Sequence, residues 1–481
     1  MMAPRDGLIR FQDSNRILSK VECEAIARRV FDFSGGNEET RVHVGNWWQG
    51  ELRWARNEVS LSSDRRDVRV FVTRFIHGVA GGSMTNQLDD ISLQAAVRAA
   101  ERNAMLFGRP QRLPEVEPPI PRLVSPTTAI WSDATYKLDT DVRGKLAQDL
   151  ISPGREKGML SAGYLEVRAG SMTELSSLRP TDPYAPWDMP YVQWTQGQCS
   201  MTVRDAEGTA SGWAGLSSYN WNNIDPSVLG KRALEKCLTS RNPVALEPGR
   251  YTVILEPQAV VDLVELLSGQ MGRVDVERDP DNPYWERYDH ALELGRSKLG
   301  RQMLDNRITI SHDPADPELG ILPDAGMQPA TWFDQGVLTN LAYSRAYALR
   351  ELNANAGVRG MGAYRMSGGD SSIEDMIRST PRGLLVTRFS DIRVLDRTTL
   401  LSTGLTRDGL WLIEHGKISK AVKNFRFTES PLFVLNSIEQ LGRPVPVFSP
   451  RRSPYAAGLS PAIVPPIKAR DFSFTSLIDA I

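Results

Sequence analysis

The sequence predicts an α+β protein in which a mixed amino-terminal part precedes a strand-rich carboxyl-terminal part. Segments with helical periodicity alternate with short strand-like runs over the first half of the chain. After about Ala245, short apolar runs separated by turn residues dominate. A chain of 481 residues also exceeds one ordinary hydrophobic core, so we expect two or three domains.

Residues 1–108 are expected to form a first α+β lobe. Apolar residues largely share one face of a helical segment at residues 19–33, and Ser34-Gly35-Gly36 ends it. Asp89 begins a second, alanine-rich helix that extends through Met105. Between the helices, strands are predicted at residues 41–44, 51–55 and 68–75.

A proline-rich joint at residues 109–126 follows, and it separates this lobe from a central α+β region at residues 127–242. The central region is expected to contain helices at residues 139–151 and 226–239 and strands at residues 163–168, 171–177 and 193–203.

Residues 243–481 are expected to form a strand-rich domain. Asp408-Gly409 lies between two apolar runs and predicts a hairpin turn. A strand at 251–255 leads directly into a helix at 258–267, and further helices are predicted at residues 288–303, 340–353 and 372–379.

Composition excludes several classes of protein. The formal net charge of −1 lacks the basic footprint of a nucleic-acid binder. No signal peptide is predicted, and no run approaches the roughly 20 apolar residues of a membrane span. Three widely spaced cysteines, Cys23, Cys199 and Cys237, argue against a disulfide framework. We therefore expect a cytoplasmic protein that binds neither nucleic acid nor membrane.

Five histidines are available for metal or acid–base chemistry, and no two of them stand at i and i+4. His290 and Glu293 are one helical turn apart, which is more typical of a surface or capping contact than of a metal site. His312 stands beside Asp313 and Asp316, which could bind a cation, although Asp-Pro pairs favour a turn.

The remaining histidines are expected to have no ligand role. His415 precedes Gly416 at a hairpin corner and should be exposed, while His43 and His77 flank strands. The sequence has no cysteine pair at zinc-ribbon spacing, no phosphate-binding glycine loop and no Gly-x-Ser-x-Gly.

The helix at residues 258–267 follows a strand directly, which is a common place for metal ligands. It offers Asp262 and Glu265 and no histidine. Zinc-assisted hydrolysis needs three protein ligands and an open fourth position, so these two carboxylates alone would hold the ion poorly. We assign no catalytic, cofactor-binding or metal-binding residue to this chain.

Several stretches together resemble the TldD/PmbA family, also called modulators of DNA gyrase and related to microcin-processing peptidases. The first is ELRWARNEVSLSSDRRDVRVFVTRFIHGVAGGSMTNQLDDISLQAAVRAAERNA, which starts at Glu51. Later matches are ITISHDP, FDQGVLTN, GGDSSIEDMIRSTPRGLLVT and, most specifically, TGLTRDGLWLIEHGKISKAVKNFRFTESPLFVLNSIEQLG. The resemblance spans nearly the whole chain.

The resemblance implies an α+β amino-terminal part and a barrel-like carboxyl-terminal domain. TldD-type chains resemble zinc peptidases and carry His-Glu-x-x-x-His on the helix that here begins near Gln258, plus a late cysteine ligand. TldE/PmbA-type chains lack these ligands and pair with a TldD-type chain. This sequence has QAVVDLVELLSG in the helix and no cysteine after Cys237, so it resembles the metal-free type.

The implied function is that of a non-catalytic subunit in a heterodimeric metallopeptidase, with zinc on the TldD-type partner and unfolded or extended peptides as substrates. Two alternatives remain open. One is a divergent stand-alone or homodimeric enzyme, which convergence of His312, Asp313 and Asp334 in one cavity would favour. The other is a binding protein that acts on gyrase.

Overall fold

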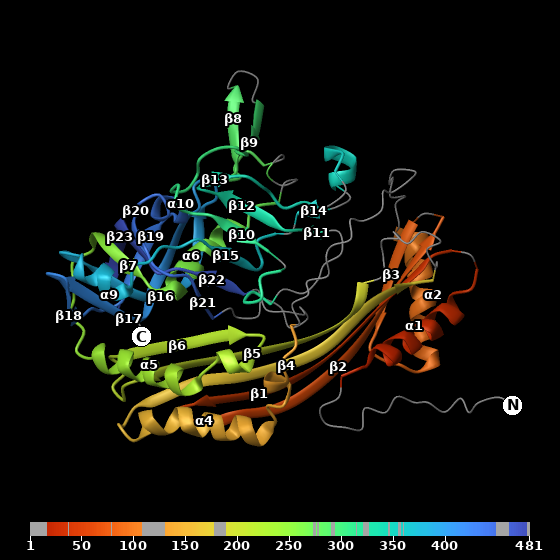
Figure 1. Cartoon of the computed structure of the whole chain (residues 1–481), viewed down its shortest axis with the longest axis horizontal. Helices are drawn as coiled ribbons and strands as arrows, with labels where there is room; N and C mark the ends of the chain where they lie inside the picture. The colour runs from red at the N-terminus through yellow and green to blue at the C-terminus, as the bar shows by residue number, and fades with distance from the viewer. Residues whose placement is uncertain are drawn as a thin grey trace.

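The computed structural model describes residues 17–36, 38–77, 79–107, 130–177, 189–272, 276, 279–289, 294–313, 315–320, 327–344, 347–354, 357–358, 360–448 and 461–478. It confirms the expected α+β class with a barrel in the carboxyl-terminal part. Figure 1 shows the amino-terminal sheet below and the carboxyl-terminal strands above it.

One six-stranded antiparallel sheet forms the base of the amino-terminal part. Its strands, in spatial order, are β3 (Val79–Thr85), β2 (Glu58–Ile76), β1 (Thr40–Ala55), β4 (Leu160–Ser176), β5 (Met189–Arg204) and β6 (Ser211–Ser218). Strand β1 pairs with β2 on one side and with β4 on the other. Strands from residues 1–108 and from residues 127–242 therefore share one sheet, while the predicted joint at residues 109–126 lies outside the described residues.

Helices cover one face of this sheet. They are α1 (Lys20–Ser34), α2 (Asp90–Phe107), α3 (Asp133–Tyr136), α4 (Thr140–Arg155) and α5 (Pro226–Thr239), with a short 3-10 turn η1 (Trp221–Asn223). Val42, Val44 and Trp48 of β1 face these helices, because side chains alternate between the two faces of a strand. A capping box of Ser19 and Glu22 starts α1. The opposite face of the sheet is turned towards the carboxyl-terminal part (Figure 1).

The carboxyl-terminal part contains a closed five-stranded barrel. Its strands, in order around the ring, are β16 (Arg382–Asp396), β7 (Gly249–Leu255), β23 (Ile467–Leu477), β19 (Phe425–Glu429) and β17 (Leu401–Glu414). The ring closes because β16 pairs with both β7 and β17. Strand β18 (Lys417–Ala421) adds to β17, and β20 (Ile438–Leu441) adds to β23. Five buried phenylalanines from the ring strands pack together: Phe389, Phe425, Phe427, Phe472 and Phe474.

A second six-stranded sheet lies beside the barrel. Its strands, in spatial order, are β13 (Val337–Leu338), β12 (Ala330–Asp334), β10 (Ile310–His312), β15 (Tyr364–Met366), β22 (Ala462–Val464) and β21 (Val445–Pro446). Two small ladders join β11 (Met327–Gln328) to β14 (Gly357–Val358) and β8 (Trp285–Asp289) to β9 (Leu294–Ser297). Helices in the described residues of this part include α6 (Pro257–Ser268), α9 (Ile373–Arg378) and α10 (Pro431–Val434). Helix α6 packs against both β16 and β22, so it lies between the barrel and the second sheet.

Two predicted helices are wrong. At residues 288–303 the described chain instead forms the β8–β9 ladder, in which Trp285 pairs with Ser297. In the described part of residues 340–353, Ala342 and Tyr343 form β-bridges with distant segments, and the helical residues are Tyr347 and the π-helical turn η2 (Ala348–Leu352). Tertiary pairing therefore overrides a local helical pattern at both places.

The predicted hairpin turn at Asp408-Gly409 is also wrong, because β17 runs straight through it. Residues 407–410 of β17 lie opposite only residues 386–388 of β16, so β17 carries one extra residue in a β-bulge. Asp408 and Gly409 have positive φ angles of 57° and 129°. The Asp-Gly pair thus does adopt the positive φ angles that it predicts, but in a bulge and not in a turn.

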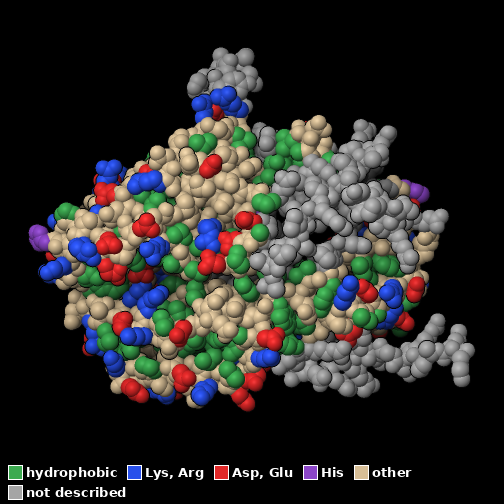
Figure 2. Space-filling model, viewed as in Figure 1, with side chains coloured by type: hydrophobic (Ala, Val, Ile, Leu, Met, Phe, Trp, Pro, Cys, Tyr) green, Lys and Arg blue, Asp and Glu red, His purple; other side chains and the backbone are tan. Residues whose placement is uncertain are grey.

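The visible surface carries acidic and basic side chains in mixture, with neither sign dominating (Figure 2). This distribution agrees with the formal net charge of −1. None of the helices in the described part of the chain is long and apolar enough to cross a membrane.

We predict that Gly409→Ala destabilises the barrel. A Cβ at this position would lie 2.3 Å from the Trp411 ring and 2.8 Å from Thr387 Oγ1. Gly300→Ala is the matched control, because Gly300 also has a positive φ, of 81°, but no heavy atom within 4 Å of its Cβ position. Urea unfolding should show Gly409→Ala losing about 1–3 kcal/mol more than the control, the usual range for overpacking. Equal losses in the two variants would contradict the packing argument.

Candidate functional site

A row of buried polar side chains crosses the sheet face that is turned towards the carboxyl-terminal part. Cross-strand register aligns these side chains, since Gln49 lies opposite Arg168 and Glu51 opposite Glu166. The same register continues from β4 into β5. We call this set the polar row, and its members are Gln49, Glu51, Glu166, Arg168, Gln196 and Gln198.

Glu51 and Glu166 are carboxylates on directly opposed strand positions, and both are buried. Like charges so placed are destabilising unless other groups compensate them. Arg53 and Arg65 form ion pairs with Glu51, whose side chain is only 1% exposed. The side-chain amide of Gln49 donates to Glu166 Oε2 at 2.8 Å. The row is thus held by charge pairing and hydrogen bonds.

Arg168 lies between two tryptophans. Its guanidinium carbon is 5.3 Å from the ring centroid of Trp47 and 5.3 Å from that of Trp194. A desolvated guanidinium over an aromatic face is a favourable cation–π geometry. This stacking fixes the positive charge of the row in one place.

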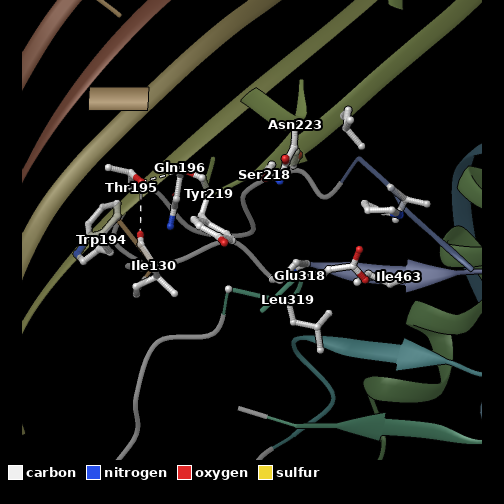
Figure 3. A pocket seen from close by; sticks show the side chains of 17 residues that line it. Ile130, Trp194, Thr195, Gln196, Ser218, Tyr219, Asn223, Glu318, Leu319 and Ile463 are labelled. Atoms are coloured by element: carbon white, nitrogen blue, oxygen red, sulfur yellow. Dashed lines mark hydrogen bonds between the residues drawn. The ribbon is translucent and has the colours of Figure 1, made fainter. Parts of the chain in front are cut away.

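A small pocket opens where the sheet meets the carboxyl-terminal part, and Figure 3 shows its lining. We call it the seam pocket, and its volume is about 150 Å³. Trp194, Thr195 and Gln196 of β5 line one side, and Leu319 and Ile463 line the other. Gln196 also belongs to the polar row, so the row leads into the pocket.

Hydrogen bonds and ring contacts fix this seam. Thr195 Oγ1 donates to the carbonyl oxygen of Tyr219 at 2.8 Å. Phe448 packs edge-on against both Tyr164 and Trp213, with ring centroids 6.0 and 5.8 Å apart. The pocket therefore has fixed walls that supply neutral hydrogen-bonding groups together with one carboxylate, that of Glu318.

Helix α6 directs its apolar residues into the core. Ala259, Val260, Val261, Leu263, Val264 and Leu267 are all buried. The Asp262 carboxylate accepts a hydrogen bond from the backbone N–H of Phe389 at 2.9 Å, which ties the helix to β16. Burial raises the pKa of Asp262 to about 7. Asp262 therefore has a structural role, and Glu265 lies one turn further along the helix.

The structure does not bring His312, Asp313 and Asp334 together. His312 is buried against Trp332, and its Nδ1 lies 3.0 Å from the carbonyl oxygen of Ala363. Asp313 is exposed and accepts a hydrogen bond from the backbone of Ala315. His312 pairs with Ala330 at one end of β12, and Asp334 is the last residue at the other end of that strand. The alternative of an enzyme centred on these residues gains no support.

The acidic residues after His312 form a turn. Asp316 accepts a hydrogen bond from the backbone of Glu318, and Arg365 makes ion pairs with both carboxylates. Arg365 holds the pKa of Asp316 below its ordinary value against the opposing effect of burial. The expected turn chemistry is confirmed.

His43, His77 and His415 belong to neither the polar row nor the lining of the seam pocket. His415 is exposed at the β17–β18 turn, as predicted. His77 is exposed, and His43 is half-buried in β1 with a pKa lowered by burial. His290 and Glu293 lie outside the described residues.

The three thiols are protonated at neutral pH. Burial raises the pKa of Cys199 to about 12 and the pKa values of Cys23 and Cys237 to about 11. A thiol is nucleophilic only as the thiolate, so these cysteines are inert packing residues. Across the described ranges, no three His, Cys, Asp or Glu side chains are grouped so that they could hold a metal ion.

Sequence reasoning missed the polar row. Its signal was present, because Glu51 and Arg53, and likewise Glu166 and Arg168, occupy alternate positions in predicted strands. Alternation places such residues on one face. Which charged face would be buried depends on packing between distant parts of the chain, and no local pattern reports that.

Residues 248–476 match the family model described as the PmbA/TldA metallopeptidase C-terminal domain. No curated protein sequence matches the chain. Three crystal structures share its fold at 16% sequence identity each. A candidate modulator of DNA gyrase from Bacteroides thetaiotaomicron has a TM-score of 0.77, covering 96% of this chain and 100% of that one.

The second structure, a candidate modulator of DNA gyrase from Thermotoga maritima, has a TM-score of 0.75, with 94% of this chain and 100% of that chain covered. The third is TldE from Thermococcus kodakarensis, with a TM-score of 0.72 and coverage of 94% and 99%. The likeness extends over the amino-terminal sheet as well as the barrel.

We predict that Asp262→Asn flattens the pH dependence of stability. The folded pKa of about 7 lies above the roughly 3.9 of an unfolded aspartate. Between about pH 4 and pH 7 the folded state keeps a proton that the unfolded state has lost. The free energy of unfolding therefore falls as pH rises through this window. Asparagine can still accept the Phe389 N–H bond but does not titrate.

Denaturant unfolding between pH 4 and pH 8 measures this effect. The slope of Asp262→Asn should be shallower than that of the wild type. An unchanged slope in Asp262→Asn would show that another group titrates in this window.

Proposed function

Because this chain belongs to the TldD/PmbA family, we propose that it is the metal-free subunit of a heterodimeric peptidase whose zinc lies on a TldD-type partner. In this proposal the chain forms part of the wall of the cavity and binds the substrate. The partner carries the zinc and catalyses the hydrolysis. The substrates are unfolded or extended polypeptides. Both chains act in the cytoplasm.

Helix α6 carries this proposal. The helix directly follows β7. In TldD-type chains the corresponding helix carries the zinc-peptidase motif His-Glu-x-x-x-His. Here six of its twelve residues are buried apolar side chains, and Asp262 is engaged by the backbone of β16. These residues do not fit a zinc ion, which needs three nitrogen, sulfur or oxygen ligands around one point. Helix α6 therefore offers no ligand set for a metal-dependent step.

The buried polar row braces the sheet on which the seam pocket lies. The seam pocket supports a role in docking, because its lining offers amide and hydroxyl groups. Such a surface can bind and orient a polypeptide backbone through fixed hydrogen-bonding groups. It supplies no activated nucleophile for hydrolysis.

The first prediction of this proposal concerns metal content. After dialysis, the purified chain should contain far less than one zinc ion per molecule, measured by elemental analysis. One zinc per chain would overturn the assignment to the metal-free type.

The second prediction concerns activity. The chain alone should leave an unfolded test protein intact, and mixing it with its TldD-type partner should give cleavage that a chelator abolishes. Glu265→Ala in this chain should leave the rate of the mixture within about twofold, because we assign that residue no chemical role. Chelator-resistant hydrolysis by this chain alone, lost in a His312→Ala variant, would refute the proposal and favour the stand-alone enzyme.

A further inference from the structure

A large groove opens between α5 and α9, where the amino-terminal part meets the outer face of the barrel. Its volume is about 1130 Å³, which exceeds the roughly 300–1,000 Å³ of an ordinary small-molecule pocket. Figure 1 shows α5 below α9, β17 and β18 at this end of the molecule. The groove shares no lining residue with the seam pocket, and we call it the outer groove.

Apolar side chains form the floor of the outer groove. Leu385 of β16 and Trp411 of β17 are buried there, in a small core that the barrel shares with α9. Ile418 and Val445 also line the groove, and they are 49% and 41% exposed. A ligand that covers this floor would therefore remove apolar surface from water, which favours binding.

Two hydrogen bonds hold the wall formed by α5 against the barrel. The indole Nε1 of Trp411 donates to the carbonyl oxygen of Thr239, the last residue of α5, at 3.2 Å. Lys236 Nζ, also on α5, donates to Glu256 Oε2 at 2.6 Å, just before α6 begins. The groove is thus fixed before a ligand arrives, and this lowers the entropic cost of binding.

Eight charged side chains line the outer groove, and six of them have ion-pair partners. The other two are Arg232 on α5 and Glu374 on α9, and both are exposed. Within the described residues, neither side chain takes part in an ion pair or a hydrogen bond. The ion pairs of the other six are Lys236–Glu256, Arg443–Asp370, Glu235–Lys231 and Asp375–Arg378.

We propose that the outer groove binds a short apolar peptide with two free termini. The carboxylate of the peptide pairs with Arg232, its ammonium group pairs with Glu374, and its side chains lie on the apolar floor. The two unpaired charges have opposite signs and stand on different walls, so they complement a ligand with one charge of each sign at its ends. This inference rests on the proposed function, because hydrolysis of unfolded polypeptides releases such peptides.

Other ligands fit these charges less well. An internal apolar segment of a longer polypeptide has no charged termini and would leave Arg232 and Glu374 unpaired. A ligand with charges of one sign only would bring like charges together at one of the two walls, which is unfavourable. The charge pattern thus selects the free termini, and the floor selects apolar side chains.

The first test titrates trileucine into the full-length chain by isothermal titration calorimetry. Trileucine should bind saturably. Blocking one terminus, in N-acetyl trileucine or in trileucine amide, should weaken binding about threefold to fivefold, the upper range for one exposed ion pair. Triglycine keeps both termini but has no apolar side chain, and it should bind at least about tenfold more weakly.

Variants of the chain assign each terminus to its wall. Arg232→Gln should bind trileucine and trileucine amide equally, yet still distinguish N-acetyl trileucine. Glu374→Gln should show the converse. The matched controls are Arg155→Gln and Glu156→Gln, which change exposed residues outside the groove lining and should match the wild type.

Three results would overturn the proposal. They are the absence of saturable trileucine binding, equal binding of trileucine and triglycine, and a preference for free termini that neither groove variant alters. Thermal unfolding of the variants should match the wild type, so that a change in affinity reports on the groove.

These outcomes are separable from failure of the proposed function, because the titrations use this chain alone. Trileucine binding with no partner-dependent cleavage would count against the peptidase complex alone. Partner-dependent cleavage without trileucine binding would remove the groove site and leave the complex standing.

Discussion

Closure of the barrel through β16 is the constraint on which the carboxyl-terminal part depends. β16 pairs with β7 and with β17, and this removes the two free edges that a five-stranded sheet would otherwise have. The ring also fixes α6, since β7 leads into the helix and Asp262 binds the backbone of β16. Every position on α6 that faces inward is then a core position. The same tie that stabilises the helix engages the Asp262 carboxylate in a hydrogen bond to the backbone of β16.

The amino-terminal sheet is coupled to the barrel by a seam of aromatic and charged groups. Phe448 lies against Tyr164 and Trp213, and the Arg388 guanidinium lies 5.0 Å from the Trp213 ring centroid. Arg388 is also paired with the buried carboxylate of Asp408 in the β17 bulge. The bulge therefore positions the Arg388–Asp408 ion pair against Trp213 of the sheet. In this way the bulge helps to hold the sheet and the barrel together.

Much of the fold could be predicted from periodicity, and the failures share one cause. The helix predicted at residues 226–239 coincides with α5, and apolar spacing located α6 within a residue at each end. The Asp-Gly pair at 408–409 reported positive φ correctly but could not distinguish a bulge from a turn. The strands at residues 41–44 and 51–55 proved to be one strand, because the intervening Trp47-Trp48-Gln49 is paired on both sides. The polar row could not be predicted for the same reason, because contacts between distant segments determine which polar side chains become buried.

The pairing of β1 with β4 has a consequence for how the chain folds. Arg41 lies opposite Ser176, and the two are 135 residues apart in sequence. Contacts of such long sequence separation must overcome a large loop-closure entropy before they add stability, and they slow folding. The β1–β2 hairpin leaves the ribosome well before β4 is synthesised. Until then β1 exposes a full strand edge, so the nascent protein depends on its central region arriving before another chain pairs with that edge.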